Sequence, residues 1–326
     1  MLALVAITGW HWVGFIACVL IFLALDLGVF HRHAHAVKFK EALVWSLVWF
    51  ALAMLFALGL EPLRGKREAL QFVTGYLIEL SLSMDNVFVI ALIFAYFRIP
   101  REHQHRVLYW GILGALIMRG LMIGLGIALI TLLDWVLYVF GAFLLYSGAR
   151  MLFVQTKLHP ENNRVVKWVR KLYPVTPELH GQRFMTKWEG RKALTPLALV
   201  LVMVETSDLL FAVDSIPAVF AVTRKPFIVF TSNVFAILGL RSLYFLLAGA
   251  IGYFRYLKYG LPLVLAFMGV EMLLDPHEQK RPFWFQVDIP TSVSLLVVAG
   301  ILLVSIVLSV TATRREEKRG KPRKPA

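Results

Sequence analysis

The chain has 326 residues, 59% of them hydrophobic, and its mean hydropathy is +0.71. This composition excludes an ordinary water-soluble globular protein and predicts an integral membrane protein. The net charge of +14 is therefore read as charge on membrane loops, and no nucleic-acid partner is expected. The single cysteine, Cys18, excludes an internal disulfide and a thiolate metal cage.

Nine apolar runs are long enough to form membrane-spanning helices. They cover residues 10–30, 41–60, 70–97, 107–131, 133–153, 194–222, 226–251, 259–275 and 290–311. We therefore predict an all-α polytopic membrane protein of about nine transmembrane helices. Its expected units are two N-terminal helices (1–69), a three-helix repeat (70–153), a basic cytoplasmic connector (154–193), a second three-helix repeat (194–275), and a last helix with a basic cytoplasmic tail (276–326).

The positive charges predict how the chain crosses the membrane. If the N-terminus lies outside, the cytoplasmic segments contain 24 Lys and Arg residues and the outer loops contain seven. Cytoplasmic loops of membrane proteins carry such an excess. We therefore expect a multi-pass membrane protein with its N-terminus outside and its C-terminus in the cytoplasm.

Three landmarks recur at a nearly constant spacing. Asp85 and Asp208 are 123 residues apart, Arg119 and Arg241 are 122 apart, and the Gly-x-x-Met-Leu segment starting at Gly148 recurs 121 residues later. A three-helix unit repeated across a cytoplasmic connector must enter the membrane in the opposite orientation. Inverted repeats with ionisable residues at their interface are typical of secondary transporters.

Two of the apolar runs contain five carboxylates. They are Glu79, Asp85, Glu205, Asp208 and Asp214. An ionised group at the centre of a spanning helix costs about 2.5–3.5 kcal/mol, so a functional site is favoured over a structural ion pair. The helical rise places Glu79 and Asp214 about 9 Å outside the central Asp85 and Asp208, and Glu205 about 4.5 Å inside them. A series of acids along the membrane normal favours an ion path.

The helical angles of these acids do not agree. Glu79 and Asn86 share one face of a straight helix, whereas Asp85 lies on another. We therefore expect locally unwound helices near Ser83–Asn86 and above Pro217, which would free backbone carbonyls as further ligands.

All donors in the two runs are oxygen or amide groups, which favours hard cations such as Mn²⁺, Mg²⁺ and Ca²⁺ over Cu⁺ or Zn²⁺. The predicted metal-binding residues are Glu79, Asp85, Asn86, Glu205, Asp208 and Asp214. Ser83, Ser207 and Ser215 are candidate pathway residues, and Arg119 and Arg241 are expected mainly to form ion pairs. Burial disfavours charged carboxylates, so exchange of protons for the metal is also expected.

Two acidic motifs carry a resemblance to a known family. The Ser83–Phe88 and Phe211–Ala218 segments, together with Phe230–Arg241, resemble the TerC family, and its Alx-type bacterial members in particular. The likeness extends over most of the chain. It implies manganese export or tellurium resistance at the bacterial inner (plasma) membrane, with the five carboxylates as the metal path.

The expected function is that of a divalent-cation transporter, most specifically a Mn²⁺ exporter with protons as the counter-ion. Mn²⁺ would be its substrate, and no tightly bound cofactor is expected. The alternatives are a membrane partner for the assembly or metalation of secreted proteins, and a tellurium-resistance factor without transport activity. An enzyme is not expected, because the spans contain no Ser/His or histidine metal-ligand motif.

Overall fold

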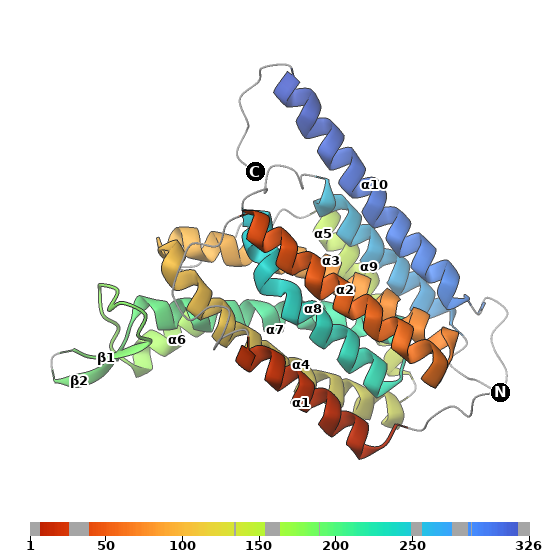
Figure 1. The fold of residues 1–326 in the computed structure, drawn as a ribbon, viewed down its shortest axis with the longest axis horizontal. Coiled ribbons are helices and arrows are strands. Elements are labelled where there is room, and N and C mark those ends of the chain that lie inside the picture. The colour runs from red at the N-terminus through yellow and green to blue at the C-terminus, as the bar shows by residue number, and fades with distance from the viewer. Residues whose placement is uncertain are drawn as a thin grey trace.

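The computed structural model describes residues 7–25, 39–133, 135–153, 164–188, 190–248, 256–275, 286–287 and 289–318. Within these ranges the chain forms ten helices and one short hairpin (Figure 1). The helices are α1 Gly9–Leu25, α2 Phe39–Arg64, α3 Lys66–Tyr96, α4 Arg101–Leu132, α5 Val136–Phe153, α6 Arg164–Leu172, α7 Pro196–Val222, α8 Pro226–Ala248, α9 Leu257–Leu274 and α10 Thr291–Lys318. The strands are β1 Met185–Trp188 and β2 Arg191–Leu194.

A helix lies at each of the nine apolar runs. Seven of the described helices are long and apolar enough to cross a membrane: α2, α3, α4, α5, α7, α8 and α10. The other two runs correspond to α1, with 17 residues, and α9, with 18. The helical, polytopic class is confirmed, and the count of nine spans stays a prediction.

The prediction of unwound helices is wrong. Helix α3 is continuous from Lys66 to Tyr96, and α7 is continuous from Pro196 to Val222 with Pro217 inside it. Membrane helices tolerate proline, because neighbouring helices and side chains can satisfy the carbonyl that proline leaves free. The long side chain of Arg119 on α4 instead connects Glu79 of α3 with Asp208 of α7.

The connector between the two halves contains structure that the sequence did not predict. After α6, strands β1 and β2 pair antiparallel, with Met185 opposite Leu194 and Trp188 opposite Arg191. Gly190 has a φ of +76°, which suits glycine at the turn. The Thr195 hydroxyl donates to the carbonyl of Arg183 at 2.7 Å and so ties the hairpin to the start of α7. Residues 154–163 of the connector and the tail beyond Lys318 lie outside the described residues.

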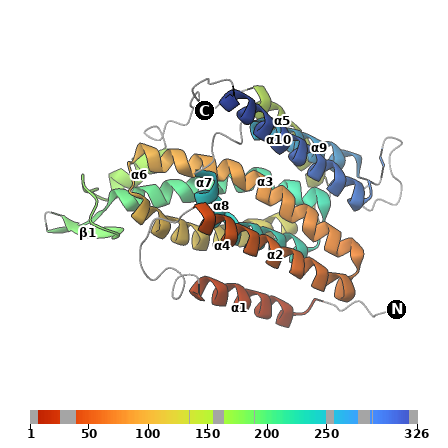
Figure 2. The same cartoon turned by 45° about the horizontal axis from the view of Figure 1, so that its top comes forward.

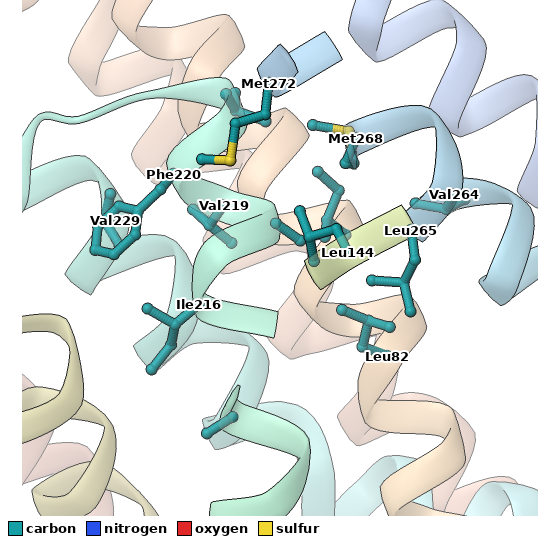
Figure 3. Close-up of a cluster of buried hydrophobic side chains, with 14 of the residues drawn as sticks. Leu82, Leu144, Ile216, Val219, Phe220, Val229, Val264, Leu265, Met268 and Met272 are labelled. Atoms are coloured by element: carbon teal, nitrogen blue, oxygen red, sulfur yellow. The ribbon is translucent and has the colours of Figure 1, made fainter. Parts of the chain in front are cut away.

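The helices form three groups side by side. Helices α3, α4, α7 and α8 occupy the centre, α1 and α2 cover one side, and α5, α9 and α10 cover the other (Figure 2). Apolar side chains from α5, α7, α8 and α9 join the centre to the last group (Figure 3). The central group contains most of the polar residues in the spans.

Helices α5 and α9 approach so closely that glycine is required on both. A Cβ at Gly148 would lie 2.8 Å from the Pro262 carbonyl oxygen, and one at Gly269 would lie 2.8 Å from that of Gly141. The two contacts are equivalent under the repeat spacing of 121. Adding 121 to the number of Gly148 gives Gly269, and subtracting 121 from the number of Pro262 gives Gly141. The two helices are therefore antiparallel and related by a local two-fold axis. The inverted repeat predicts such a relation for α5 and α9; the equivalence of α3 and α4 with α7 and α8 stays a prediction.

Candidate ion path around Arg119

Arg119 is the centre of the buried polar network. It is 2% exposed on α4 and forms ion pairs with Glu79 of α3 and Asp208 of α7. Its contact with Asp208 is two-pronged, with Nη2 donating to Oδ1 at 2.9 Å and Nε donating to Oδ2 at 3.3 Å. Nη1 donates to the Asn233 amide oxygen of α8 at 2.9 Å and to the Ser215 hydroxyl of α7 at 3.3 Å. One guanidinium thus connects four helices.

This network explains how two acids can lie inside the central group. Glu79 is 0% exposed and Asp208 is 8% exposed, and an isolated ion in such a place would be strongly disfavoured. Asn86 adds a further donor, since its Nδ2 lies 3.1 Å from the Asp208 Oδ1. The ion-pair role predicted for Arg119 is therefore observed. Arg241, the other predicted ion-pair residue, is buried on α8.

Asp85 and Glu205 differ from the acids bound to Arg119. Neither forms an ion pair among the described residues, whereas Glu79 and Asp208 do. Each has one buried carboxylate oxygen without a hydrogen-bond partner there, as Glu79 has at its Oε2. The same holds for the amide oxygen of Asn86. Buried acceptors without donors are uncommon in native proteins and call for an explanation. A bound cation or a proton would satisfy these oxygens.

Glu205 occupies a recess that a glycine creates. Its carboxylate lies where a Cβ of residue 114 on α4 would be, so Gly114 makes room for this acid. In the sequence, the Gly111-x-x-Gly114 spacing indicates only close helix packing. Neighbouring Gly111 does serve packing, because a Cβ at that position would lie 3.4 Å from the Val204 side chain.

Gly114→Ala should displace the Glu205 carboxylate and lower metal flux about tenfold, a loss of roughly 1.4 kcal/mol in the transport barrier. Flux in proteoliposomes, normalised to inserted protein, measures this effect. Gly124→Ala is the matched control, because a Cβ there meets nothing within 4 Å. Equal flux in the two variants would show that the recess at Gly114 has no role.

Asp214 lies apart from the Arg119 network. It is half-buried on α7, and the Ser147 hydroxyl of α5 donates to its Oδ1 at 2.7 Å. Arg150, one turn further along α5, is close enough to act on its charge. Asp214 therefore connects the path to α5, the helix that packs against α9.

The three serines predicted as pathway residues lie on α3 and α7. Ser83 and Ser215 are each 1% exposed, and Ser207 is half-buried. Sequence reasoning assigned no role to two polar residues, Asn233 and Ser147. Asn233 is 0% exposed within an apolar run, and a lone amide in such a run is a signal that could have identified it.

The carboxylates do not form one ready coordination sphere. Among the described residues, no three His, Cys, Asp or Glu side chains come together closely enough to hold a metal ion. Arg119 binds two of the predicted ligands, and the remaining acids are spread along the helices. Metal binding by the six predicted residues stays a prediction.

Comparison with known proteins identifies relatives that match most of the chain. The model of the integral membrane protein TerC family matches residues 64–317. A Myxococcus xanthus membrane protein, STKORF319, is 52% identical over 304 residues, covering 93% of this chain and 92% of its own. Alx of Escherichia coli K12, whose name proposes a membrane-bound redox modulator, is 45% identical over 317 residues, covering 94% and 96%. No solved structure matches the chain. The chain is therefore a member of the TerC family of integral membrane proteins.

Proposed function

We propose that this protein exports hard divalent cations, with Mn²⁺ as the preferred substrate. The observation that carries the proposal is the pair of half-buried acids Asp85 and Glu205. Each has one buried oxygen without a hydrogen-bond partner and no cationic partner among the described residues, while Arg119 is already bound to two other acids. A purely structural network would pair its acids. An acid surplus in the interior of a membrane protein is a mark of an ion pathway.

The charge balance near Arg119 favours a divalent ion. Glu79, Asp85, Glu205 and Asp208 against one guanidinium leave a formal surplus of three negative charges. One divalent cation reduces the surplus to one, and one proton removes the rest. When the cation leaves, protons can replace it, so exchange of metal for protons follows from the same balance.

The donors suit hard cations that keep part of their water shell. Carboxylates, the Asn86 amide and serine hydroxyls supply only oxygen to the ion, whereas copper and zinc favour thiolate or imidazole ligands. Ions such as Mg²⁺ bind through one or two carboxylates and retain several waters. This mode fits a path of single carboxylates better than a closed protein cage.

The positive-inside pattern supports an inner-membrane protein with its N-terminus outside and its C-terminus in the cytoplasm. Glu205 then faces the cytoplasmic half and Asp214 the outer half of the path. Redox modulation, which the name of the relative Alx proposes, could not use an internal dithiol here, because Cys18 is the only cysteine. An assembly partner or a resistance factor without transport would not require the uncompensated acids.

Purified protein in liposomes should carry Mn²⁺ down its gradient, and an opposed pH gradient should accelerate the flux. Zn²⁺ and Cu⁺ should pass at least about tenfold more slowly, because the site lacks soft ligands. A fluorescent metal indicator inside the vesicles measures each ion, and empty vesicles give the leak. Absence of Mn²⁺ flux above that leak would overturn transport in favour of the assembly or resistance roles.

A further inference from the structure

A second buried carboxylate site lies where α3, α9, α10 and the turn between α7 and α8 meet. Glu271 of α9 is 6% exposed, and the Ser294 hydroxyl of α10 donates to its Oε1. Its other oxygen, Oε2, is buried and has no hydrogen-bond partner among the described residues. Glu271 lies in the second copy of the repeated Gly-x-x-Met-Leu segment, and the sequence alone indicated no function for it.

This carboxylate borders a polar pocket of about 360 Å³. Two further buried polar side chains line the pocket, and they are fixed in place. The Thr223 hydroxyl donates to the Gln71 Oε1 at 3.1 Å, while the Gln71 Nε2 donates to the Val222 carbonyl at 3.3 Å. At a liquid share of about 30 Å³ per water, the pocket can hold about ten waters. A hydrated ion fits this space.

The charged side chains at the pocket carry a small positive excess. Arg224 lies 3.5 Å from Asp275, and Lys225 lies 2.6 Å from Glu68, which also binds Arg64 at 2.8 Å. Arg67 and Glu271 are the remaining charged side chains of the lining. Among the described residues, α5 and α10 contribute no charged group to this lining. A cation would therefore be held mainly by Glu271 and released readily.

The pocket follows Asp214 along the direction of α7. Beyond Asp214, the helix contributes Ile216 and Val219 to an apolar cluster and then Phe220 to the pocket lining. Figure 3 shows Val219 on the side of Met272 of α9 and the Phe220 ring beside Val229 of α8 in this cluster. The cluster thus separates Asp214 from the pocket, and the predicted topology places the pocket at the outer end.

We propose that Glu271, with Ser294 and bound waters, forms an exit site where a hard divalent cation pauses after passing Asp214 and the apolar cluster. A single carboxylate assisted by a hydroxyl and waters is a binding mode that such ions accept. The basic rim keeps this binding weak, as release to the outside requires. This inference rests on the proposed export function and adds a residue that the two acidic motifs do not contain.

Metal protection of a cysteine in the pocket tests the exit site directly. The full-length protein with Cys18→Ser and Thr291→Cys places one thiol in the lining, where its maleimide labelling rate can be measured. Mn²⁺ at ten times its dissociation constant should slow labelling about tenfold, by mass action. Glu271→Gln in this background should abolish the protection, whereas the control Glu61→Gln, an exposed acid outside the lining, should leave it unchanged.

Further variants distinguish loss of the carboxylate from misfolding of the pocket. Glu271→Asp keeps the carboxylate and should retain part of the protection, which shows that the pocket still folds. Protection that persists in Glu271→Gln would overturn the proposal. Because maleimide reacts with the thiolate, labelling is compared at one pH. A labelling rate that Mn²⁺ does not slow would also overturn the proposal.

Flux measured on the same proteoliposomes distinguishes this inference from the proposed function. Wild-type Mn²⁺ flux without any protection at residue 291 would remove the exit site and leave export standing. Protection without wild-type flux would leave a cation-binding pocket but overturn its role as an exit. Protection and flux together, with slower flux in Glu271→Gln, are the result that we expect.

Discussion

Arg119→Met should lower the free energy of unfolding by about 3–5 kcal/mol, the usual effect of removing one partner of a buried ion pair. The substitution keeps much of the side-chain volume but leaves Glu79 and Asp208 without their cation inside the helix group. It also removes the donors to Asn233 and Ser215. Thermal unfolding of the detergent-purified protein, followed by circular dichroism, measures the loss.

A neutral version of the same network provides the control. Combining Arg119→Met with Glu79→Gln and Asp208→Asn removes all three charges, so much of the stability should return. Transport should nevertheless be absent in this triple variant, because it lacks two acids of the proposed path. Unchanged unfolding of the single Arg119→Met variant would show that the ion pairs do not hold the four helices together.

Asp85→Asn should have the opposite profile, with flux lowered at least about a hundredfold, or roughly 2.7 kcal/mol, and unfolding unchanged. Asp85 has no ion pair among the described residues and a buried oxygen without a donor there, so the amide removes a charge that no protein cation compensates. The bound metal ion, in contrast, loses a charged ligand. Liposome flux and thermal unfolding on one preparation measure both effects.

Asp208→Asn is the matched comparison for Asp85→Asn. It should lower flux and also reduce stability, because it weakens the two-pronged contact with Arg119. The contrast separates an acid that serves the ion from one that also holds the fold. Normal flux in Asp85→Asn, with intact insertion, would mean that this carboxylate is structural.

The sequence was sufficient to predict the long apolar helices and to single out the acids within them, because both signals are local. A run of apolar residues must be helical in a membrane, and an acid within it stands out at once. The contacts among these acids depend on which helices become neighbours. Asn233 meets Arg119 across 114 positions of chain, and Ser147 meets Asp214 across 67, so neither spacing follows a motif.

The incorrect expectation of unwound helices has a physical cause. The helical angles of Glu79, Asp85 and Asn86 do not fit one face of a straight helix, and this mismatch predicts a break. The structure instead surrounds α3 with polar contacts from more than one helix, and Arg119 extends from α4 to Glu79. Similarly, the short strands β1 and β2 have no buried alternating face that could have predicted them.

The glycine contact between α5 and α9 has a mechanical consequence. Where Gly148 and Gly269 bring the two backbones together, no flexible side chain lies between them to absorb a displacement. The pair should therefore tilt as one rigid body. Ser147, which holds Asp214, and Glu271, which borders the outer pocket, belong to that same body. A change of ion occupancy at Asp214 would thus be transmitted to the pocket through the backbone, without any direct contact between the two carboxylates.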